Sequence, residues 1–396
     1  MNTDLASLTS KHLVLASLGL ILVVFTVFIP SIAFDVRRTD SSQGPLMRAG
    51  VTSVEDLGTQ PLPRGVVHSQ RINLQLESGE TVTSDRSLLE SEMKVMPLKA
   101  GDDVYVAQTG TPSEPVYFVA DYARGSSLLL LGAIFIAVVL VVARGHGVWS
   151  LLGLGASLLV ILRFIIPGIL AGYDPVLIAF FGALVIMTTT LFLAHGISWK
   201  SSVALAGTAF SLVLAIILSA VGIDFAKLSG LISEEATTLN LLTEGGIDAR
   251  GLLLGGIIIG ALGVLDDVTI AQASAVFELR RANPGLNRKE LVVRGMNVGR
   301  DHIAATVNTL FLAYAGAALP LLIILATQTD GFVTSSSQEL VATEIVRSLI
   351  GGIAITAAVP ITTALAATVA ASLEELEAAP EDWSVTPEAS GYTTDG

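Results

Sequence analysis

Long apolar runs alternate with short polar segments along most of the chain. The runs lie near residues 13–33, 127–143, 148–166, 175–194, 203–221, 252–277, 303–326 and 345–371. Most of them approach or exceed the roughly 20 apolar residues that an α-helix needs to cross a bilayer. The pattern therefore predicts an all-α polytopic membrane bundle with about eight transmembrane helices, all but the first within residues 126–372.

The first run allows two interpretations. Ser31, Ile32 and Ala33 form a small-residue segment that could serve as the cleavage site of a secretory signal peptide. The apolar part of a signal peptide usually has about 7–15 residues, whereas this run is long enough to span a bilayer. We therefore expect residues 1–33 to remain as an N-terminal transmembrane anchor.

Residues 34–125 follow a different pattern. Ile72, Leu74 and Leu76 alternate with polar residues, and Ser78 and Gly79 supply a turn before the next alternating stretch. Alternation with a period of two, broken by Gly and Asp turns, is typical of antiparallel strands. This segment is predicted to form a small β-barrel or β-sandwich domain.

The composition agrees with a membrane protein. The chain has 52% hydrophobic and only 14% charged residues, and its mean hydropathy is +0.70. Soluble domains carry about 25% charged residues. The net charge of -13 argues against a nucleic-acid partner, because phosphate binding needs a basic surface. Much of the acid lies in residues 373–396, which we expect to form a disordered cytoplasmic tail.

Several kinds of chemistry are absent from the sequence. The chain contains no cysteine, which excludes disulfides, thiolate metal sites and cysteine nucleophiles. It has no P-loop, so ATP is not expected to drive it directly. His302 has no second histidine nearby, and we expect neither a metal site nor a cofactor.

The distribution of basic residues predicts the orientation. The segment 278–302 is the most basic of the chain and contains Arg280, Arg281, Arg288, Lys289, Arg294 and Arg300. The loop 222–250 is instead rich in Asp and Glu. Because basic loops stay in the cytoplasm, we expect both termini on the inner side of the cell membrane and residues 34–125 on the outer side.

Two adjacent carboxylates, Asp266 and Asp267, interrupt the sixth apolar run. A charged group in the middle of a membrane costs about 2.5–3.5 kcal/mol, so such residues usually face a partner or a water-filled cavity. Gly256, Gly260 and Gly263 lie in the same run, and we expect them to allow close packing against a neighbouring helix. An alternative is that both carboxylates lie near the inner interface, where water solvates them.

The seventh run also contains polar residues. Asn297, Arg300 and Asn308 recur at helical spacing before and within it. Because each is costly in lipid alone, we expect them to form one buried polar cluster with the two carboxylates. An alternative is that Asn308 only hydrogen-bonds one helix to another. Pro320 predicts a break near the end of this run.

Three stretches carry a resemblance to a known family. They are Gly260-Ala261-Leu262-Gly263-Val264-Leu265-Asp266-Asp267, Gly295-Met296-Asn297-Val298-Gly299-Arg300-Asp301, and Thr306-Val307-Asn308-Thr309-Leu310-Phe311-Leu312-Ala313-Tyr314-Ala315-Gly316 through Leu319-Pro320. Together with the anchor and the β-domain, they resemble the YibE/F family of bacterial membrane proteins. The resemblance runs from the anchor to the last span, without the acidic tail. It implies a multi-pass membrane protein and supplies no catalytic residues.

Three functions fit these features. We expect Pro360 to kink the last span. Together with the carboxylates and the glycines, this favours a secondary transporter or permease for an unknown small solute or ion, not an enzyme. The alternative is an envelope assembly or sensing protein that acts through its outer β-domain, with a homo-oligomer or an envelope protein as its partner. An intramembrane aspartyl protease would need Asp174 and Asp266 in one site.

Overall fold

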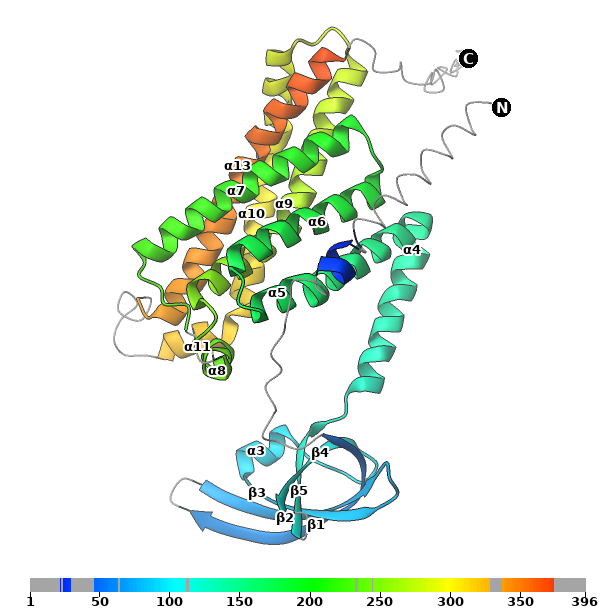
Figure 1. The fold of residues 1–396 in the computed structure, drawn as a ribbon, viewed down its shortest axis with the longest axis vertical. Helices are drawn as coiled ribbons and strands as arrows, with labels where there is room; N and C mark the ends of the chain where they lie inside the picture. Colours follow the sequence, from blue (N-terminus) through cyan, green and yellow to red (C-terminus); the bar gives the residue numbers. More distant parts are fainter. Residues whose placement is uncertain are drawn as a thin grey trace, which may run out of the picture. The chain divides into compact units, whose positions relative to one another are not determined.

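The computed structural model describes residues 22, 24–29, 46–62, 65–111, 114–231, 234–243, 245–327 and 337–373. Most of the predicted anchor, residues 1–33, and nearly all of the predicted tail, residues 373–396, lie outside the described residues. The chain divides into two compact units (Figure 1). A helical unit comprises Met1–Arg37 and Val148–Gly396, and a sheet unit comprises Arg38–Gly147.

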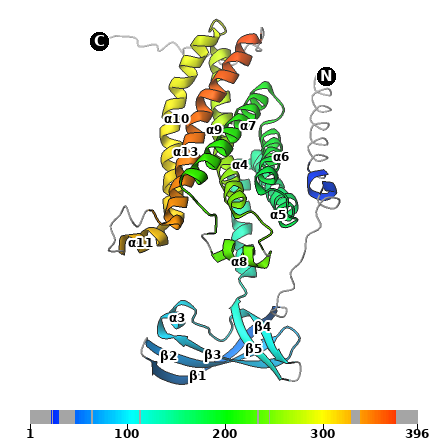
Figure 2. The ribbon, with the colours of Figure 1, turned by 60° about the vertical axis from the view of Figure 1, so that its left-hand side comes forward.

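The sheet unit is built on one antiparallel sheet. Its elements are β1 (Met47–Leu62), β2 (Gly65–Leu76), β3 (Thr81–Leu89), α3 (Glu90–Val95), β4 (Asp103–Thr111) and β5 (Glu114–Tyr122). The five strands lie in the order β3-β2-β1-β4-β5. Because β3 and β5 contact each other without pairing, the sheet curls into a partly open barrel (Figure 2). The predicted small β-domain is confirmed as an antiparallel sheet.

Alternating residues of the strands fill the barrel. Ile72, Leu74, Val104 and Val106 have no exposed surface, while the residues between them are polar or partly exposed. Burying one such side chain contributes about 1.5–3 kcal/mol. Gly79, with a φ of +88°, makes the tight turn between β2 and β3 that this alternation requires. The sheet unit therefore has an apolar core of its own.

The helical unit packs around one central helix. Its elements are η1 (Val24–Phe28), the end of α4 (Gly125–Val160), η2 (Ile161–Ile165), α5 (Ile166–Leu170), α6 (Pro175–His195), α7 (Trp199–Phe225), α8 (Glu234–Leu242), α9 (Ala249–Ala282), α10 (Arg288–Ala317), α11 (Leu319–Thr327) and α13 (Glu339–Ser372). α9 contacts α6, α7, α10 and α13 (Figures 1 and 2). Residues on α9 therefore meet neighbours on several sides.

Local sequence signals fix where the helices begin. The side chain of Asp174 accepts hydrogen bonds from the backbone N–H groups of Val176 and Leu177, at 2.8 and 2.9 Å. Pro175 fits the first turn, where no backbone donor is needed. At the start of α10, Asn287 and Glu290 cap each other's backbone N–H groups at 2.9 and 3.0 Å. Both starts follow the ordinary rules of helix capping.

The helices alternate in direction. α6 and α9 run parallel, because Gly255 lies against Ala179 near their starts and Asp266 meets Thr190 further along. The short connections 196–198 and 283–287 make α7 and α10 run the opposite way. The basic segment 278–294 therefore shares one end of the unit with the α6–α7 connection, and the acid-rich α7–α9 loop lies at the other end.

Five helical stretches of the described chain are long and apolar enough to cross a membrane: Gly125–Leu170, Pro175–His195, Trp199–Phe225, Ala249–Ala282 and Glu339–Ser372. A sixth is present if α10 and α11, which are bent by 68°, count as one span. This bend follows Ala317 and coincides with the break that Pro320 predicts. The predicted total of eight spans is not confirmed.

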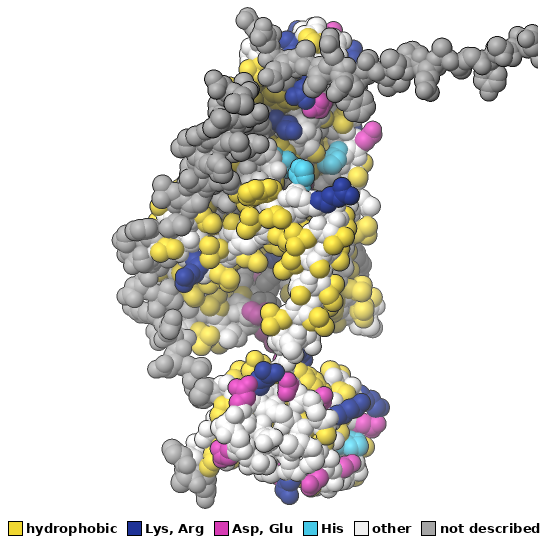
Figure 3. Space-filling view, turned by 90° about the vertical axis from the view of Figure 1, so that its right-hand side faces the viewer, with side chains coloured by type: hydrophobic (Ala, Val, Ile, Leu, Met, Phe, Trp, Pro, Cys, Tyr) yellow, Lys and Arg dark blue, Asp and Glu magenta, His cyan; other side chains and the backbone are white. Residues whose placement is uncertain are grey.

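The difference in span number has two sources. The first predicted span lies mostly outside the described residues. The second and third runs form two helices that meet without a loop at a kink at Arg144, where φ is 50° and ψ is −131°, so they count as one stretch of 46 residues, Gly125–Leu170. Apolar side chains such as Leu129 and Val141, both 77% exposed, cover this stretch. Such surfaces are rare in water and suit a bilayer (Figure 3).

Candidate functional site

Asp266 lies near the middle of α9 and lines a cavity of about 220 Å³. The cavity wall consists of Ser157, Ile161, Ile186, Met187, Thr190, Ile259, Leu262, Gly263 and Asp266. These residues come from α4, η2, α6 and α9, all within the helical unit. A water molecule occupies about 30 Å³ in the liquid, so the space suits a few waters or an ion.

The carboxylate of Asp266 is poorly satisfied. Its Oδ2 atom accepts a hydrogen bond from Thr190 Oγ1 at 3.4 Å, which is long for an O–H···O bond. Its Oδ1 atom is buried and has no hydrogen-bond partner among the described residues. A buried acceptor without a partner costs about 1–3 kcal/mol, and more when it is charged. A proton, a cation or a water in the cavity would remove this cost.

The hydroxyl of Thr190 is shared between several acceptors. Thr190 Oγ1 also bonds to the backbone carbonyl oxygens of Ile186, at 2.9 Å, and Met187, at 3.2 Å. A hydroxyl has one proton to donate and two lone pairs that accept. The shorter contact to Ile186 competes for that proton. A protonated Asp266 would instead donate to Thr190, and a bound cation would use the free lone pairs of both.

Asp267 has a different environment. Its side chain is exposed and is not among the residues that line the cavity. Successive residues of an α-helix point about 100° apart, so neighbouring side chains face different surroundings. The structure thus separates two carboxylates that the sequence leaves equivalent, and Asp266 is the one that faces the cavity.

Buried polar groups continue along α9 beyond Asp266. Thr269 Oγ1 lies 2.6 Å from Thr208 Oγ1 on α7, and neither side chain is exposed. Gln272 donates from Nε2 to the carbonyl oxygen of Gly295 at 2.8 Å and to Thr363 Oγ1 at 2.7 Å. These bonds join α9 to α7, α10 and α13. Sequence analysis missed them, although their spacing of three residues from Asp266 marks one side of the helix.

The other predicted site residues lie elsewhere. Arg300 donates from Nη1 to Asn297 Oδ1 at 3.0 Å, and both side chains are exposed. Asn308 is exposed too. No hydrogen bond of the described residues joins any of these three to Asp266 or Asp267. The structure therefore does not bring the five residues together, because Asp266 turns toward α6 and α9 meets α10 through Gln272.

The predicted glycine strip makes little helix contact. A Cβ at Gly256 or Gly263 would meet no described atom within 4 Å, and one at Gly260 would lie 3.3 Å from the Tyr314 hydroxyl. Close packing occurs at other glycines: a Cβ at Gly207 would lie 2.3 Å from Thr362 Oγ1, and one at Gly299 would lie 2.4 Å from Val359 Cγ1. A Cβ at Gly251, Gly255 or Gly295 would also lie 3.3 Å or less from a neighbouring atom.

Pro360 lies inside α13, which continues to Ser372. It lines an apolar groove of about 410 Å³ between α10 and α13, together with Val307, Phe311, Leu349, Gly352, Ile353, Thr356 and Ala357. The expected kink at this proline stays a prediction.

The two carboxylates that a protease would need are far apart. Asp174 caps the start of α6, and Thr190, the neighbour of Asp266, lies 16 residues further along the same helix. At about 1.5 Å per residue this places the two carboxylates on the order of 20 Å apart. Asp174 and Asp266 therefore do not form a two-carboxylate site.

The family comparison covers the part of the chain that holds this cavity. A family model described as YibE/F-like protein matches residues 131–372, which is more than half of the chain. The match includes α9 and α10 and leaves out the sheet. No curated protein and no solved structure matches the chain. By the extent of the family match, the chain belongs to the YibE/F-like protein family.

Proposed function

We propose that this protein is a secondary transporter in which Asp266 carries a coupling proton or monovalent cation. The observation that supports this proposal is the buried Oδ1 atom of Asp266, which has no partner among the described residues and lies beside a cavity. It sits in the middle of a 34-residue helix that is apolar enough to span a membrane. Carboxylates in such positions mark ion or proton pathways.

The cavity offers oxygen ligands around the carboxylate. Ser157 Oγ donates to the carbonyl oxygen of Gly153 at 2.9 Å, which leaves its lone pairs available. Thr190 Oγ1 likewise donates to the carbonyl oxygen of Ile186, and its lone pairs stay available. A single carboxylate with two hydroxyls can neutralise one positive charge. This favours a proton or a monovalent cation as the coupling ion, while the transported solute is a small molecule or ion that remains to be identified.

The proposed orientation places both termini in the cytoplasm and the sheet unit outside the cell membrane. The alternation of the helices supports it, since the basic segment 278–294 and Lys200 share one end of the helical unit. Basic loops are retained on the cytoplasmic side.

Ion flux through the full-length protein tests the proposed function without knowledge of the solute. The purified protein is reconstituted in proteoliposomes, and proton or sodium entry is followed after a membrane potential is imposed. We expect flux with the natural protein and a loss of at least about tenfold with Asp266→Asn. Natural protein that carries neither ion with or without candidate solutes would contradict the proposal.

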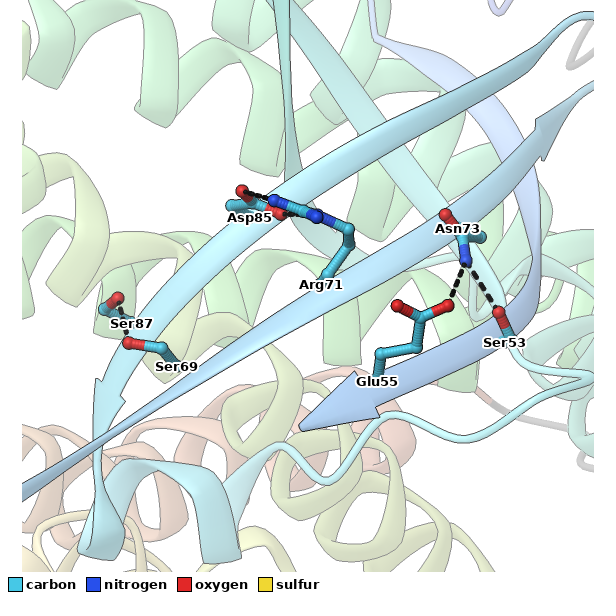
Figure 4. Close-up of polar contacts among 7 residues, drawn as sticks. All are labelled: Ser53, Glu55, Ser69, Arg71, Asn73, Asp85 and Ser87. Carbon is cyan, nitrogen blue, oxygen red and sulfur yellow. Dashed lines mark hydrogen bonds and ion pairs between the residues drawn. The ribbon is translucent and has the colours of Figure 1, made fainter. Parts of the chain in front are cut away.

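A second candidate function rests on the sheet unit. A row of polar side chains crosses the outer face of β1, β2 and β3 (Figure 4). Arg71 forms two hydrogen bonds of 2.8 Å with Asp85, and Asn73 donates to Ser53 at 2.8 Å. Five-stranded partly open barrels include the OB-fold, whose second and third strands bind polymers. This favours a partner-binding role of the kind an envelope protein would need.

Variants of this face test the second candidate. Arg71→Ala in the full-length protein should abolish the cellular role but leave the ion flux unchanged if the sheet is the functional part. The reverse pattern, in which flux and cellular role depend on Asp266 alone, would exclude it. Each side chain of the row already has a partner in the sheet, which ranks this candidate second.

A further inference from the structure

α10 has an outward face that carries polar and small residues. Its buried residues are Leu291, Gly295, Gly299 and Leu310, and it contacts α9, α11 and α13. The exposed residues at three- and four-residue spacing on the other side are Asn297, Asp301, Ala304, Asn308, Leu312 and Ala315. This spacing places them on one stripe of the helix. α10 lies at the edge of the helical unit (Figure 2).

This stripe does not suit contact with lipid alone. Asn308 lies inside the apolar run 303–326, and its amide has no hydrogen-bond partner among the described residues. An amide in hydrocarbon loses the hydrogen bonds that water would provide. Its transfer from water to an apolar medium without a compensating hydrogen bond costs several kcal/mol. Asp301 lies two turns away on the same stripe, and its neighbour Arg300, which donates to Asn297, carries the opposite charge. The stripe therefore needs a polar partner.

We propose that the outward face of α10 binds the same face of a second copy of the chain. A two-fold axis parallel to the helices brings each residue to its own counterpart at the same depth. Asn308 is self-complementary, because its amide both donates and accepts hydrogen bonds. Arg300 and Asp301 are complementary across such an axis, since each copy offers one positive and one negative charge at one depth. Ala304 and Ala315 let the two backbones approach.

Other segments of the chain fit this face less well. The apolar run 13–33 has only Ser17, Thr26 and Ser31 as polar side chains, and residues 128–142 of α4 have none. Neither contains an Asn, Gln, Asp or Arg that could bond to Asn308 and the charged pair. Lipid tails offer no hydrogen bonds at all. A second copy supplies both the amide and the charges.

The absence of cysteine makes the dimer directly testable. A variant with one cysteine can form a disulfide only between two copies, when their Cα atoms approach to about 4.4–6.8 Å. We expect Ala304→Cys, oxidised in native membranes, to give a dimer on a non-reducing gel. Ile217→Cys, at a 55% exposed apolar position on α7, is the matched control and should stay monomeric.

A second variant separates specific pairing from chance collision. Adding Asn308→Leu to Ala304→Cys should lower the dimer association constant by roughly three- to tenfold, as expected for the loss of one interhelical hydrogen-bonded pair in a membrane. No dimer from Ala304→Cys, or equal dimer from Ile217→Cys, would overturn the proposal. So would an Asn308→Cys variant that reacts with a membrane-impermeant maleimide and forms no dimer, because Asn308 would then line a water-filled path.

Discussion

Thr190 Oγ1 on α6 lies 3.4 Å from Asp266 Oδ2 on α9, and both side chains line the same cavity. The two helices run parallel, so this contact depends on their register. Gly255 holds that register nearer the start of both helices. A Cβ at this glycine would lie 3.4 Å from the Cβ of Ala179 on α6. The glycine that allows close approach is therefore separate from the strip that the sequence suggests.

Thr190→Val should reduce ion flux by about tenfold while the protein stays folded. Valine has almost the shape of threonine but lacks the hydroxyl that faces Asp266. A hydrogen bond to a charged group is worth about 1.5–3 kcal/mol, and the long bond of 3.4 Å here is expected at the lower end of that range, which is about tenfold. Flux in proteoliposomes measures the effect. Thr189→Val is the matched control, since the buried Thr189 hydroxyl has no partner within the part of the chain that the structure describes and does not line the cavity. Equal flux loss in both variants would remove Thr190 from the site.

Gln272→Leu should destabilise the bundle by about 1–3 kcal/mol. The change leaves the carbonyl oxygen of Gly295 and the hydroxyl of Thr363 without the amide that joins them. Thermal unfolding of the purified protein in detergent should shift to lower temperature. Leu265→Met, a volume-conserving change at a fully buried position about two turns earlier on α9, should shift it less. An unchanged midpoint for Gln272→Leu would show that these bonds contribute no net stability.

The sequence accounts for much of the fold. Asp174 and Pro175 mark the start of α6, and the alternation of Ile72, Leu74 and Leu76 marks a strand of the barrel. These elements follow from local rules of capping and periodicity. The division of the stretch Gly125–Leu170 at Arg144 does not follow from these rules. A positive φ at a residue other than glycine is imposed by its surroundings rather than by its own preference.

The candidate site is only partly predictable. A carboxylate inside an apolar run is conspicuous, so Asp266 is found from sequence, but its exposed neighbour Asp267 is equally conspicuous. Which of them faces a cavity depends on where α6 packs, and that is a tertiary property. Asn308, which the sequence predicts in a buried cluster, is exposed for a related reason. Spacing shows that residues share a face of α10 but not whether this face points inward.

The orientation is testable by labelling, because the chain has no cysteine of its own. A cysteine at Ser78, exposed in the β2–β3 turn, should react with a membrane-impermeant maleimide in intact cells. A cysteine at Lys289, exposed in the basic segment, should react only after the cells are permeabilised. Reaction of the Lys289 variant in intact cells would reverse the proposed orientation.

Acid should weaken the pairing of β2 with β3. Two hydrogen bonds from Arg71 favour the charged form of Asp85, which lowers the pKa of that carboxyl below its ordinary value. The stabilisation is present above the ordinary pKa of about 3.9 and is lost as the pH falls through the lowered pKa. Because both side chains are about half exposed, water screens the pair and its effect on stability is small.

Hydrogen exchange of the β2 and β3 amides, measured between neutral and acidic pH, reports this change. The natural protein should lose protection at acidic pH, and Asp85→Asn should show the lower protection at both. A variant whose protection follows the same pH profile as the natural protein would assign the acid effect to another carboxyl.

The most direct test of the central claim compares two neighbouring carboxyl groups. Infrared difference spectra of the full-length protein, recorded as pH or sodium concentration is changed, detect a carboxyl group that gains or loses a proton or a cation. We predict a carboxyl signal that disappears in Asp266→Asn and persists in Asp267→Asn, because only Asp266 lines the cavity. A signal that survives in Asp266→Asn, or that disappears only in Asp267→Asn, would contradict the role proposed for Asp266.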